Sequence, residues 1–303
     1  MDPRTLPLRR AVIATVLAGI VLGLMGLRTD PRAAAAATAP PVVVVMLENQ
    51  EEFKLNATNA PYLMSLKAQG RYFSKYYGVM HPSFANYLAV SGGSTFGFTS
   101  GAITAGMIPG TSLWDQLSAA GVSWGVYQEQ MPTPCFAKAT KVVASPTKDK
   151  YAIGHNPGVV YANVFTSAEC QQVLPLTQMP STLPAMSFVT PSYCNDMHGV
   201  ANLTFPADCQ KKTQALITRS DTWLASHVEA WRAAGAVVIV TFDEGTTKQG
   251  TGGHVYTVAV GPGIAPSVDA TTYNHYSLLA GLEDRFGVAR LRNAAGAPPM
   301  PMG

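Results

Sequence analysis

Acidic and amide side chains follow two strongly apolar segments of the chain. Glu48 and Asn49 come directly after the run 41–47, and Asp243 and Glu244 come directly after the run 236–242. Carboxylate and amide oxygens are ligands that suit a hard divalent cation better than copper. A single acid at such a place is explained as a helix N-cap, but a doubled polar pair at two separate strand ends is not. The two pairs therefore predict a site for a divalent metal ion.

A hydroxyl nucleophile is offered by Ser83, within the segment MHPSFANYL at 80–88. Ser83 stands at the predicted N-terminus of a short helix over 84–90, where unpaired N–H groups and the helix dipole favour an anionic oxygen and a bound phosphate. A neighbouring cation would lower the pKa of the hydroxyl and neutralise charge on a phosphoryl group during its transfer. The alternative is that Ser83 is only the N-cap of this helix.

Histidines are concentrated in predicted loops. One loop histidine is more often structural than catalytic, but several in a chain with acids at strand ends favour a convergent site. A histidine could also protonate a leaving alcohol, because its unperturbed pKa is about 6.5. His227 falls within a predicted helix and is interpreted as a surface or packing residue. The five loop histidines are His81, His155, His198, His254 and His275.

The elements that must position these residues alternate between strands and helices. The runs 41–47 and 236–242 are continuously apolar, as in strands buried on both faces of a parallel sheet, and further strands are predicted over 122–127, 185–190 and 255–260. Ligands of such sheets bind beyond the carboxyl ends of the strands, so both acidic pairs are expected at one edge.

Helices are predicted between these strands. One is opened by a cap at Asn59 and closed by Gly70, and others cover 111–121, 210–234 and 276–286. The alternation predicts an α/β fold with a three-layer sandwich around a mostly parallel central sheet. The irregular stretch 129–182 is interpreted as an insertion over the active face of the same domain, and the Pro-rich tail 294–303 as a loose end.

The N-terminus has the layout of a secretory signal. Arg4, Arg9 and Arg10 precede an apolar run over 11–27, and alanines follow at 33–37. We predict a signal peptide over 1–36 and one catalytic domain over 37–303, secreted and without a stable membrane span. An uncleaved membrane anchor is the alternative, since 17 residues reach the lower limit of spanning length. The Arg9–Arg10 pair leaves open export by the general or the twin-arginine route.

Charge argues against nucleic acid as a partner. Of the 21 basic and 18 acidic residues, five basic and two acidic ones lie within 1–32, which leaves 16 of each in the remainder. Binding to nucleic acid depends on an excess of Lys and Arg that neutralises phosphates. The chain after residue 32, which has no net charge, therefore does not fit the class of nucleic-acid-binding proteins.

Four cysteines lie in the part of the chain predicted to be exported. An even number in an oxidising compartment indicates two disulfides, and none of the four stands in a C-x-x-C pair. Three pairings are possible. We expect pairing between nearest neighbours, Cys135–Cys170 and Cys194–Cys209.

The order of the motifs resembles the bacterial phosphoesterase family. The motifs are Glu48-Asn49, HPSFANY at 81–87, DMH at 196–198, FDEG at 242–245 and GGH at 252–254. This family contains phospholipases C and secreted acid phosphatases, including short phosphatidylinositol-3-phosphatase-like enzymes, and belongs to the alkaline phosphatase-like superfamily. The resemblance covers 42–288 and implies the alkaline phosphatase-like version of the sandwich.

The resemblance also implies a role for individual residues. Ser83 matches the nucleophile, and Asn86 the residue that helps to hold a phosphate oxygen; Ala85 stands where the superfamily often has proline. Glu244 stands where two-metal relatives carry a histidine, so one ion is expected and a second stays open. The implied metal ligands are Glu48, Asn49, Ser83, Asp243 and Glu244, and the surrounding polar cluster comprises Asp196, His198 and His254, with His81 and His155 as further pocket residues.

Together these observations predict a secreted, metal-dependent phosphomonoesterase of the acid phosphatase type that forms a phosphoserine at Ser83. Its substrate would be a small phosphomonoester or a phosphoinositide such as phosphatidylinositol 3-phosphate. One alternative is a phosphodiesterase of the phospholipase C type, for which the chain is short and lacks an obvious lipid-binding C-terminal domain. Another is a protein that binds phosphate esters without turnover. A sulfatase lacks support, because no C-x-P-x-R or S-x-P-x-R segment surrounds Ser83.

Overall fold

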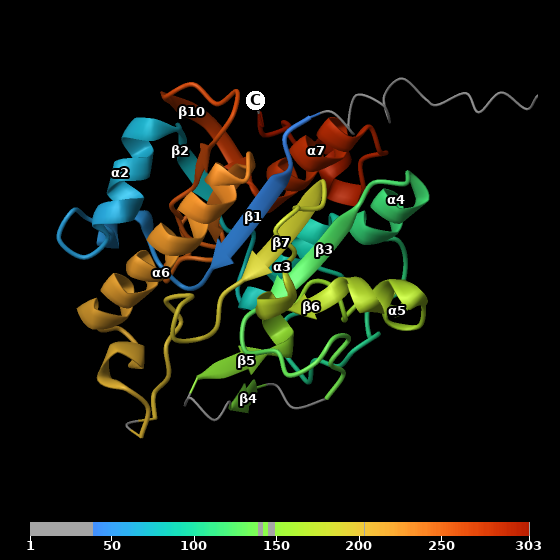
Figure 1. Ribbon diagram of the computed structural model, residues 1–303, viewed down its shortest axis with the longest axis horizontal. Helices are drawn as coiled ribbons and strands as arrows, with labels where there is room; N and C mark the ends of the chain where they lie inside the picture. The colour runs from blue at the N-terminus through green and yellow to red at the C-terminus, as the bar shows by residue number, and fades with distance from the viewer. Residues whose placement is uncertain (1–38, 139–141, 145–148, 203, 303) are drawn as a thin grey trace, which may run out of the picture.

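A computed structural model describes residues 39–138, 142–144, 149–202 and 204–302, so the predicted signal peptide at 1–36 lies outside the described residues. Eight strands form one central sheet in the order β10-β2-β9-β8-β1-β7-β3-β6 (Figure 1). Neighbouring strands are parallel, except that β9 is antiparallel to β2 and β8. The strands are β1 (Val42–Leu47), β2 (Arg71–Tyr77), β3 (Trp124–Gln128), β6 (Val173–Pro175), β7 (Met186–Thr190), β8 (Val237–Phe242), β9 (Val258–Val260) and β10 (Ser267–Asn274), with a separate pair β4 (Val142–Ala144) and β5 (Lys150–Ala152).

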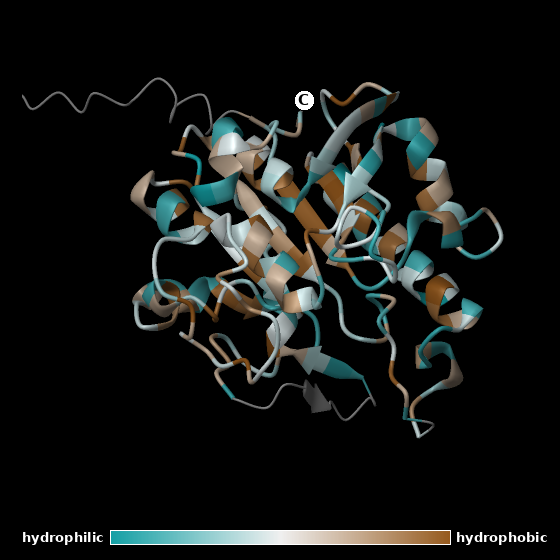
Figure 2. Cartoon of the chain, turned by 180° about the vertical axis from the view of Figure 1, so that it is seen from behind, coloured by the Kyte–Doolittle hydropathy of each residue, from teal (hydrophilic) through white to brown (hydrophobic). Residues whose placement is uncertain are grey.

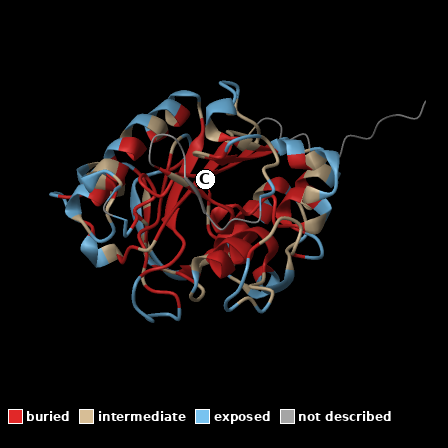
Figure 3. Ribbon diagram, turned by 90° about the horizontal axis from the view of Figure 1, so that it is seen from below, coloured by how far each residue is buried: buried red, intermediate tan, exposed pale blue. Residues whose placement is uncertain are grey.

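Helices cover both faces of this sheet. On one face α2 (Pro61–Gln69) packs against α6 (Gln214–Ala233), and on the other α3 (Ser83–Gly92) packs against α4 (Leu113–Ala119) and α7 (His275–Phe286). Seen from below, the buried sheet stands between the two groups of helices (Figure 3). This arrangement is the predicted three-layer sandwich. Shorter helices are α5 (Ala162–Phe165), beside α4, and the 3-10 turns η1 (Glu52–Lys54), η2 (Ile153–His155), η3 (Ala168–Gln172), η4 (Leu176–Gln178), η5 (Ala207–Cys209) and η6 (Arg292–Gly296).

The central strands are buried along their whole length. Every residue of β1 and of β8 is buried, as is every residue of β7. Figure 2 shows the same strands as the most hydrophobic part of the chain. Because each residue packs against helices on one face or the other, continuous β-branched runs are favoured at these positions.

The sequence analysis did not predict β2 and β10, two neighbouring strands near one edge of the sheet. β2 alternates between buried and less buried residues, and β10 is exposed at most of its positions because it lies at the edge. The strand predicted over 255–260 is formed only over Val258–Val260. Polar residues in β2 and β10 interrupt the hydrophobic pattern, which explains why the sequence did not predict these two strands.

The N-terminus of α2 is capped from another helix. Asp221 of α6 accepts hydrogen bonds from the backbone N–H groups of Tyr62 and Leu63, both at 2.9 Å. The predicted cap was wrong, because the side-chain oxygen of Asn59 accepts from Asn56 N instead. Gly70 follows the last helical residue, and its backbone lies so close to β9 that a Cβ there would be 2.2 Å from the carbonyl oxygen of Ala259.

The stretch 129–182 is more closely integrated than an insertion. It supplies β6, which pairs in parallel with β3 at the edge of the main sheet. Both expected disulfides are present, and Cys135–Cys170 ties the start of the stretch to η3. The described part of this stretch therefore extends the sheet as well as approaching the cavity described below.

The prediction of a loose C-terminal tail was wrong. Met300 and Met302 are buried in the main core. Met300 N donates to Ser277 O at 2.9 Å, and the Arg285 guanidinium donates to Met302 O at 3.2 Å. The prolines of this segment suggested a loose chain, but Met300 and Met302 pack against Gly281 of α7. Among the described residues, no helix combines the length and apolarity needed to cross a bilayer.

A buried carboxyl group in α7 leads to a prediction about stability. Glu283 is fully buried; one oxygen accepts from Leu291 N at 2.8 Å, and the other lacks a hydrogen-bond partner among the described residues. Burial raises the pKa of Glu283 to about 8. The folded state therefore retains this proton while the unfolded state releases it, so stability falls as pH rises from about 4.5 towards 8.

We expect Glu283→Gln to remove that part of the pH dependence, because glutamine keeps the shape and the acceptor for Leu291 without an ionisable proton. Above pH 8 the variant should be more stable than the wild type by about 1–3 kcal/mol. Urea unfolding at several pH values between 5 and 9 measures this. If both proteins lose stability equally steeply over that range, the carboxyl group is not the cause.

Candidate active site

Three carboxylates from two strand ends meet at the start of α3. Glu48 follows β1, and Asp243 and Glu244 follow β8. The two strands are adjacent and parallel, with Leu47 opposite Phe242, so the acidic pairs lie side by side. Ser83 is the first residue of α3 and faces them. The expectation of one acidic edge is therefore met by the geometry.

The Ser83 hydroxyl is directed at carboxylates rather than at the helix backbone. It donates to Glu48 Oε2 at 3.0 Å and lies 3.4 Å from Glu244 Oε1. The N-cap position of α3 is Pro82, not Ser83. The alternative that Ser83 is only a cap is therefore not supported.

Asn49 and Asp243 are fixed against each other. Asn49 N donates to Asp243 Oδ1 at 3.0 Å, and its side-chain amide donates to Glu48 Oε2 at 2.7 Å. Asn49 has a φ of 58°, a left-handed conformation that asparagine tolerates better than most residues. The second oxygen, Asp243 Oδ2, is buried and has no hydrogen-bond partner within the described residues.

The cluster holds more acidic groups than its surroundings neutralise. Burial and the neighbouring Asp243 raise the pKa of Glu48, while burial and Glu244 raise the pKa of Asp243 to about 8. Burial also raises the pKa of Glu244 to about 7. Over the described part of the chain, their ion-pair partners are histidines, His81 and His155, and no lysine or arginine pairs with them.

These features fit a divalent cation. A hard cation binds to oxygen donors, and this site offers several carboxylates. A bound cation would also give the buried Asp243 Oδ2 the partner that it lacks among the described residues. The fold brings together the five residues predicted as ligands, which are Glu48, Asn49, Ser83, Asp243 and Glu244. A bound cation would allow all three acids to ionise.

Two buried side chains donate hydrogen bonds to these acidic residues. Tyr87 donates to Glu48 Oε1 at 2.8 Å. His275 Nε2 donates to the carbonyl oxygen of Asp243 at 2.5 Å, and Tyr76 OH lies 3.0 Å from His275 Nδ1. Burial lowers the pKa of His275 to about 4, so the ring is neutral and accepts from Tyr76. His275 therefore positions Asp243.

Asp196, His155 and His198 form a second polar group beside the carboxylates. His155 Nε2 lies 3.4 Å from Glu48 Oε1, and its Nδ1 lies 3.6 Å from Asp196 Oδ2. Asp196 Oδ1 accepts from His198 N at 2.7 Å, and burial raises the pKa of Asp196. The His155 and His198 rings are 5.7 Å apart, with Tyr193 stacked on His198. The fold thus brings these three predicted residues together.

A cavity of about 700 Å³ opens over Ser83. Lys211, which the sequence analysis missed, is the one lysine or arginine of the described chain that lines it, and its Nζ lies 3.4 Å from His198 Nε2. His198 Nδ1 donates to Gly199 O at 2.7 Å, so Nε2 is oriented to accept from Lys211. The lining also includes apolar and small residues, among them Phe84, Phe98, Ile103, Ala152 and Gly154.

His254 is not part of this cavity. Its Nε2 donates to the carbonyl oxygen of Ser74 at 2.9 Å, and its ring lies against Tyr77. The role implied for His254 in the polar cluster is therefore corrected. The Gly-Gly-His motif brings the backbone of His254, not its imidazole, towards the site, as described below.

Asn86 is also placed differently from the prediction. Its side chain is fully buried; Oδ1 accepts from Val79 N at 2.7 Å, and Nδ2 donates to Met80 O at 2.6 Å and approaches Glu244 Oε2 at 3.4 Å. Both donor hydrogens of the amide thus face partners within the protein. Asn86 orients the segment before Ser83 and is not among the residues that line the cavity.

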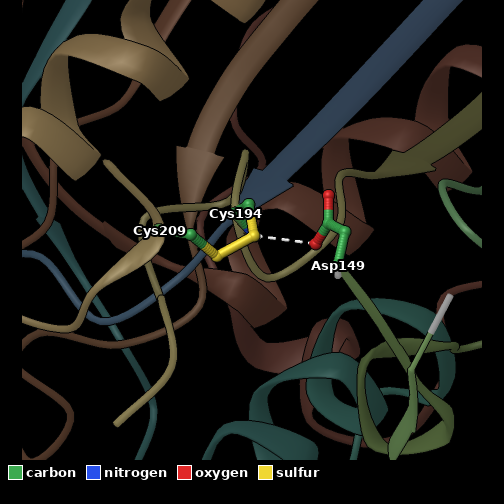
Figure 4. A group of neighbouring side chains, drawn as sticks. All are labelled: Asp149, Cys194 and Cys209. Atoms are coloured by element: carbon green, nitrogen blue, oxygen red, sulfur yellow. Dashed lines mark hydrogen bonds between the residues drawn. A yellow bond between two sulfur atoms is a disulfide. The ribbon is translucent and has the colours of Figure 1, made fainter. Parts of the chain in front are cut away.

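Asp149, Cys194 and Cys209 lie close together (Figure 4). They are not a metal site, because the two sulfurs are joined in a disulfide and a metal ligand must be a thiolate. Asp149 instead accepts from Cys194 N at 3.1 Å and from the Ser192 hydroxyl at 2.6 Å. These bonds hold the loop that carries Asp196.

A second cavity, of about 770 Å³, lies between α6 and 175–183 and is lined mainly by apolar residues. His227 lines it, with its ring stacked on Trp223 at 3.9 Å, as expected of a packing residue. None of the predicted catalytic or metal-binding residues reaches this cavity. The candidate active site is therefore the smaller cavity over Ser83.

Comparison with proteins of known sequence supports the predicted enzyme class. A phosphatidylinositol-3-phosphatase of Mycobacterium tuberculosis is 30% identical over 251 residues, which cover 80% of this chain and 75% of that protein. An acid phosphatase of Aspergillus fumigatus is 29% identical over 75% of this chain, which spans only 50% of the fungal protein. Both names agree with a phosphoric monoester hydrolase.

Solved structures show the same fold at low sequence identity. An alkaline phosphatase superfamily protein from Vibrio parahaemolyticus superposes with a TM-score of 0.55 at 14% identity, covering 84% of this chain and 69% of that one. Murine ectonucleotide pyrophosphatase/phosphodiesterase 5 gives a TM-score of 0.56 at 10% identity, covering 86% of this chain and 100% of that one. The alkaline phosphatase-like fold is thereby confirmed.

Residues 47–289 match the sequence pattern of the Phosphoesterase family, and the chain belongs to that family.

Proposed function

We propose that this protein is an exported, metal-dependent phosphomonoesterase that transfers the phosphoryl group of its substrate to Ser83. The observation that carries the proposal is the position of the Ser83 hydroxyl. It stands at the N-terminus of α3, 3.0 Å from Glu48 and 3.4 Å from Glu244, beside the orphaned oxygen of Asp243.

Each residue of the site has a part in this reaction. Glu48, Asn49, Ser83, Asp243 and Glu244 would hold the cation. When bound, it supplies Lewis-acid activation of a hydroxyl and neutralises phosphate charge. Ser83 Oγ attacks phosphorus, and the N-terminus of α3 favours the negative charge that gathers there.

The far side of the cavity would hold the rest of the phosphate and the leaving group. Lys211 presents an ammonium group beside His198 and can bind a phosphate oxygen. His81, His155 and His198 line the cavity, and one of them donates a proton to the leaving alkoxide. Water then hydrolyses the phosphoserine.

The proposed substrate is a small phosphomonoester or the exposed phosphate of an inositol lipid. The names of the relatives favour both, and the cavity of about 700 Å³ is lined by Lys211 and histidines together with apolar residues. Export is supported by the signal-like sequence at 1–36 and by the two disulfides, which persist in oxidising compartments.

We expect a monoester to be hydrolysed faster than a matched diester, with activity highest at acidic to neutral pH. The proton donor is a histidine, which acts only while it is protonated, so the rate should fall towards alkaline pH. The test is kcat/KM against pH for p-nitrophenyl phosphate and bis(p-nitrophenyl) phosphate. A faster diester, or a rate still rising above about pH 9, favours a phospholipase C-type enzyme. No turnover of either ester favours a binding protein.

A further inference from the structure

Glu51 is a buried acid that neither the motif analysis nor the proposed reaction uses. Its side chain has no solvent-exposed surface. Its Oε1 accepts hydrogen bonds from Thr246 N at 2.8 Å and Thr247 N at 2.7 Å, and its Oε2 accepts from His254 N at 3.1 Å. The carboxylate of Glu51, three residues after Glu48, thus binds three backbone N–H groups of the loop that follows β8.

The loop is wrapped closely around this carboxylate. Gly245 N donates to Gly252 O at 2.7 Å and so closes the loop across its base. A Cβ on Gly245 would lie 2.2 Å from Glu51 Oε1, and one on Gly253 would lie 2.7 Å from the same oxygen. Both positions therefore require glycine. This packing gives a physical reason for Gly245 in the FDEG motif and for Gly253 in the GGH motif.

The loop carries two groups of the candidate active site. Glu244 immediately precedes Gly245. The carbonyl oxygen of Thr247 accepts from His81 Nε2 at 2.8 Å, and His81 Nδ1 lies 3.0 Å from Glu244 Oε2. Glu51 thus holds the backbone on both sides of Thr247, and Thr247 in turn orients the imidazole that contacts Glu244.

We propose that Glu51 is a positioning residue that fixes Glu244 and His81 for cation binding and catalysis. The inference rests on the proposed function, because it concerns the same cation site. Glu51 acts through the loop, because the hydrogen bonds of its carboxylate run to the backbone N–H groups of Thr246, Thr247 and His254. A carboxylate suits this part because it accepts several N–H bonds with both oxygens.

The test compares Glu51→Gln with Glu52→Gln. Glutamine at 51 keeps the size of the side chain but has one acceptor oxygen, so at least one of the three loop bonds is lost. The Glu52 side chain is a matched control, because the hydrogen bonds of its carboxylate run to Lys67 and Tyr72 and not to the backbone N–H groups of the loop. Mn²⁺ and Ca²⁺ are titrated separately into chelator-treated protein by calorimetry, and amide hydrogen exchange of 245–254 is followed in the same metal-free samples.

For Glu51→Gln we expect cation affinity to fall about 10- to 100-fold, the usual effect of losing a residue that orients metal ligands. Exchange in 245–254 should accelerate at least about tenfold, with kcat for p-nitrophenyl phosphate recovering partly at high metal concentration. Glu52→Gln should stay within about twofold of the wild type in all three. A Glu51→Gln protein that melts earlier but keeps wild-type affinity and loop exchange would overturn the proposal.

Two further measurements keep the inference testable if Glu51→Gln does not fold. In metal-free wild type the amides of Thr246 and Thr247 should be protected from exchange, and unprotected amides would refute the role. Gly245→Ala should repeat the loss of cation affinity, because its Cβ would displace the Glu51 carboxylate. If the wild type itself binds neither ion and its activity survives chelation, the proposed metal dependence fails. Loop exchange and the kcat of Glu51→Gln then still decide the positioning role.

Discussion

Replacing Ser83 by alanine is expected to lower kcat for p-nitrophenyl phosphate by about three orders of magnitude or more. In the proposed reaction the hydroxyl oxygen attacks phosphorus, and removal of a covalent nucleophile leaves only the contribution of the surrounding charges. The fold should be retained, because the Ser83 hydroxyl bonds to the acids of the site and does not cap α3. Steady-state kinetics and thermal unfolding of the purified variant measure both effects.

Ser91→Ala is the matched control for this prediction. Ser91 also belongs to α3 and is buried, but its hydroxyl donates to Tyr87 O at 2.6 Å, away from the cavity. Its kcat should stay within about twofold of the wild type. A Ser83→Ala variant that keeps more than about a tenth of the wild-type rate would exclude Ser83 as the nucleophile.

Asp243→Asn is expected to give the second large loss, through the metal. Asparagine replaces a charged residue of the proposed cation site by a neutral one, so the cation should bind at least about tenfold more weakly and activity at a fixed metal concentration should fall accordingly. Raising the metal concentration should restore part of the activity. Activity of the wild type should likewise disappear with chelator and return when the metal is added back.

Asp284→Asn controls for the loss of one aspartate. Asp284 is exposed on α7 and pairs with Arg290, so its replacement should change neither metal affinity nor kcat. An Asp243→Asn variant that is fully active in chelator-treated buffer would refute the assignment of a metal site at the end of β8.

The sequence predicted the acidic edge of the site because its signal is local. Continuous apolar runs ending in Glu48-Asn49 and Asp243-Glu244 identify buried parallel strands, and the geometry of a parallel sheet then places both pairs at one edge. Ser83 was identified for the same reason, since a polar residue at the start of a helix can be recognised from a few neighbours.

The contacts that could not be predicted join residues far apart in the sequence. Asp221 caps α2 from α6, and Glu51 holds a loop nearly two hundred residues further along. His254 looked like a catalytic histidine because residue type and loop position do not tell which way a ring points. Lys211 lies beside His198 because the Cys194–Cys209 disulfide and the hydrogen bond from Lys211 N to Val200 O bring the two segments together.

The order of strands in the sheet has a consequence for how the chain folds. β1 pairs with β7 and β8, so that Val42 lies opposite Met186 and Val237. β2 pairs with β9 and β10, which lie near the other end of the chain. During synthesis both strands emerge long before any neighbour exists. Non-local pairing of this kind slows folding, and the segment VVVVML meanwhile exposes an uncharged β-branched surface. Refolding of the isolated chain should therefore be slow and its yield should fall as protein concentration rises.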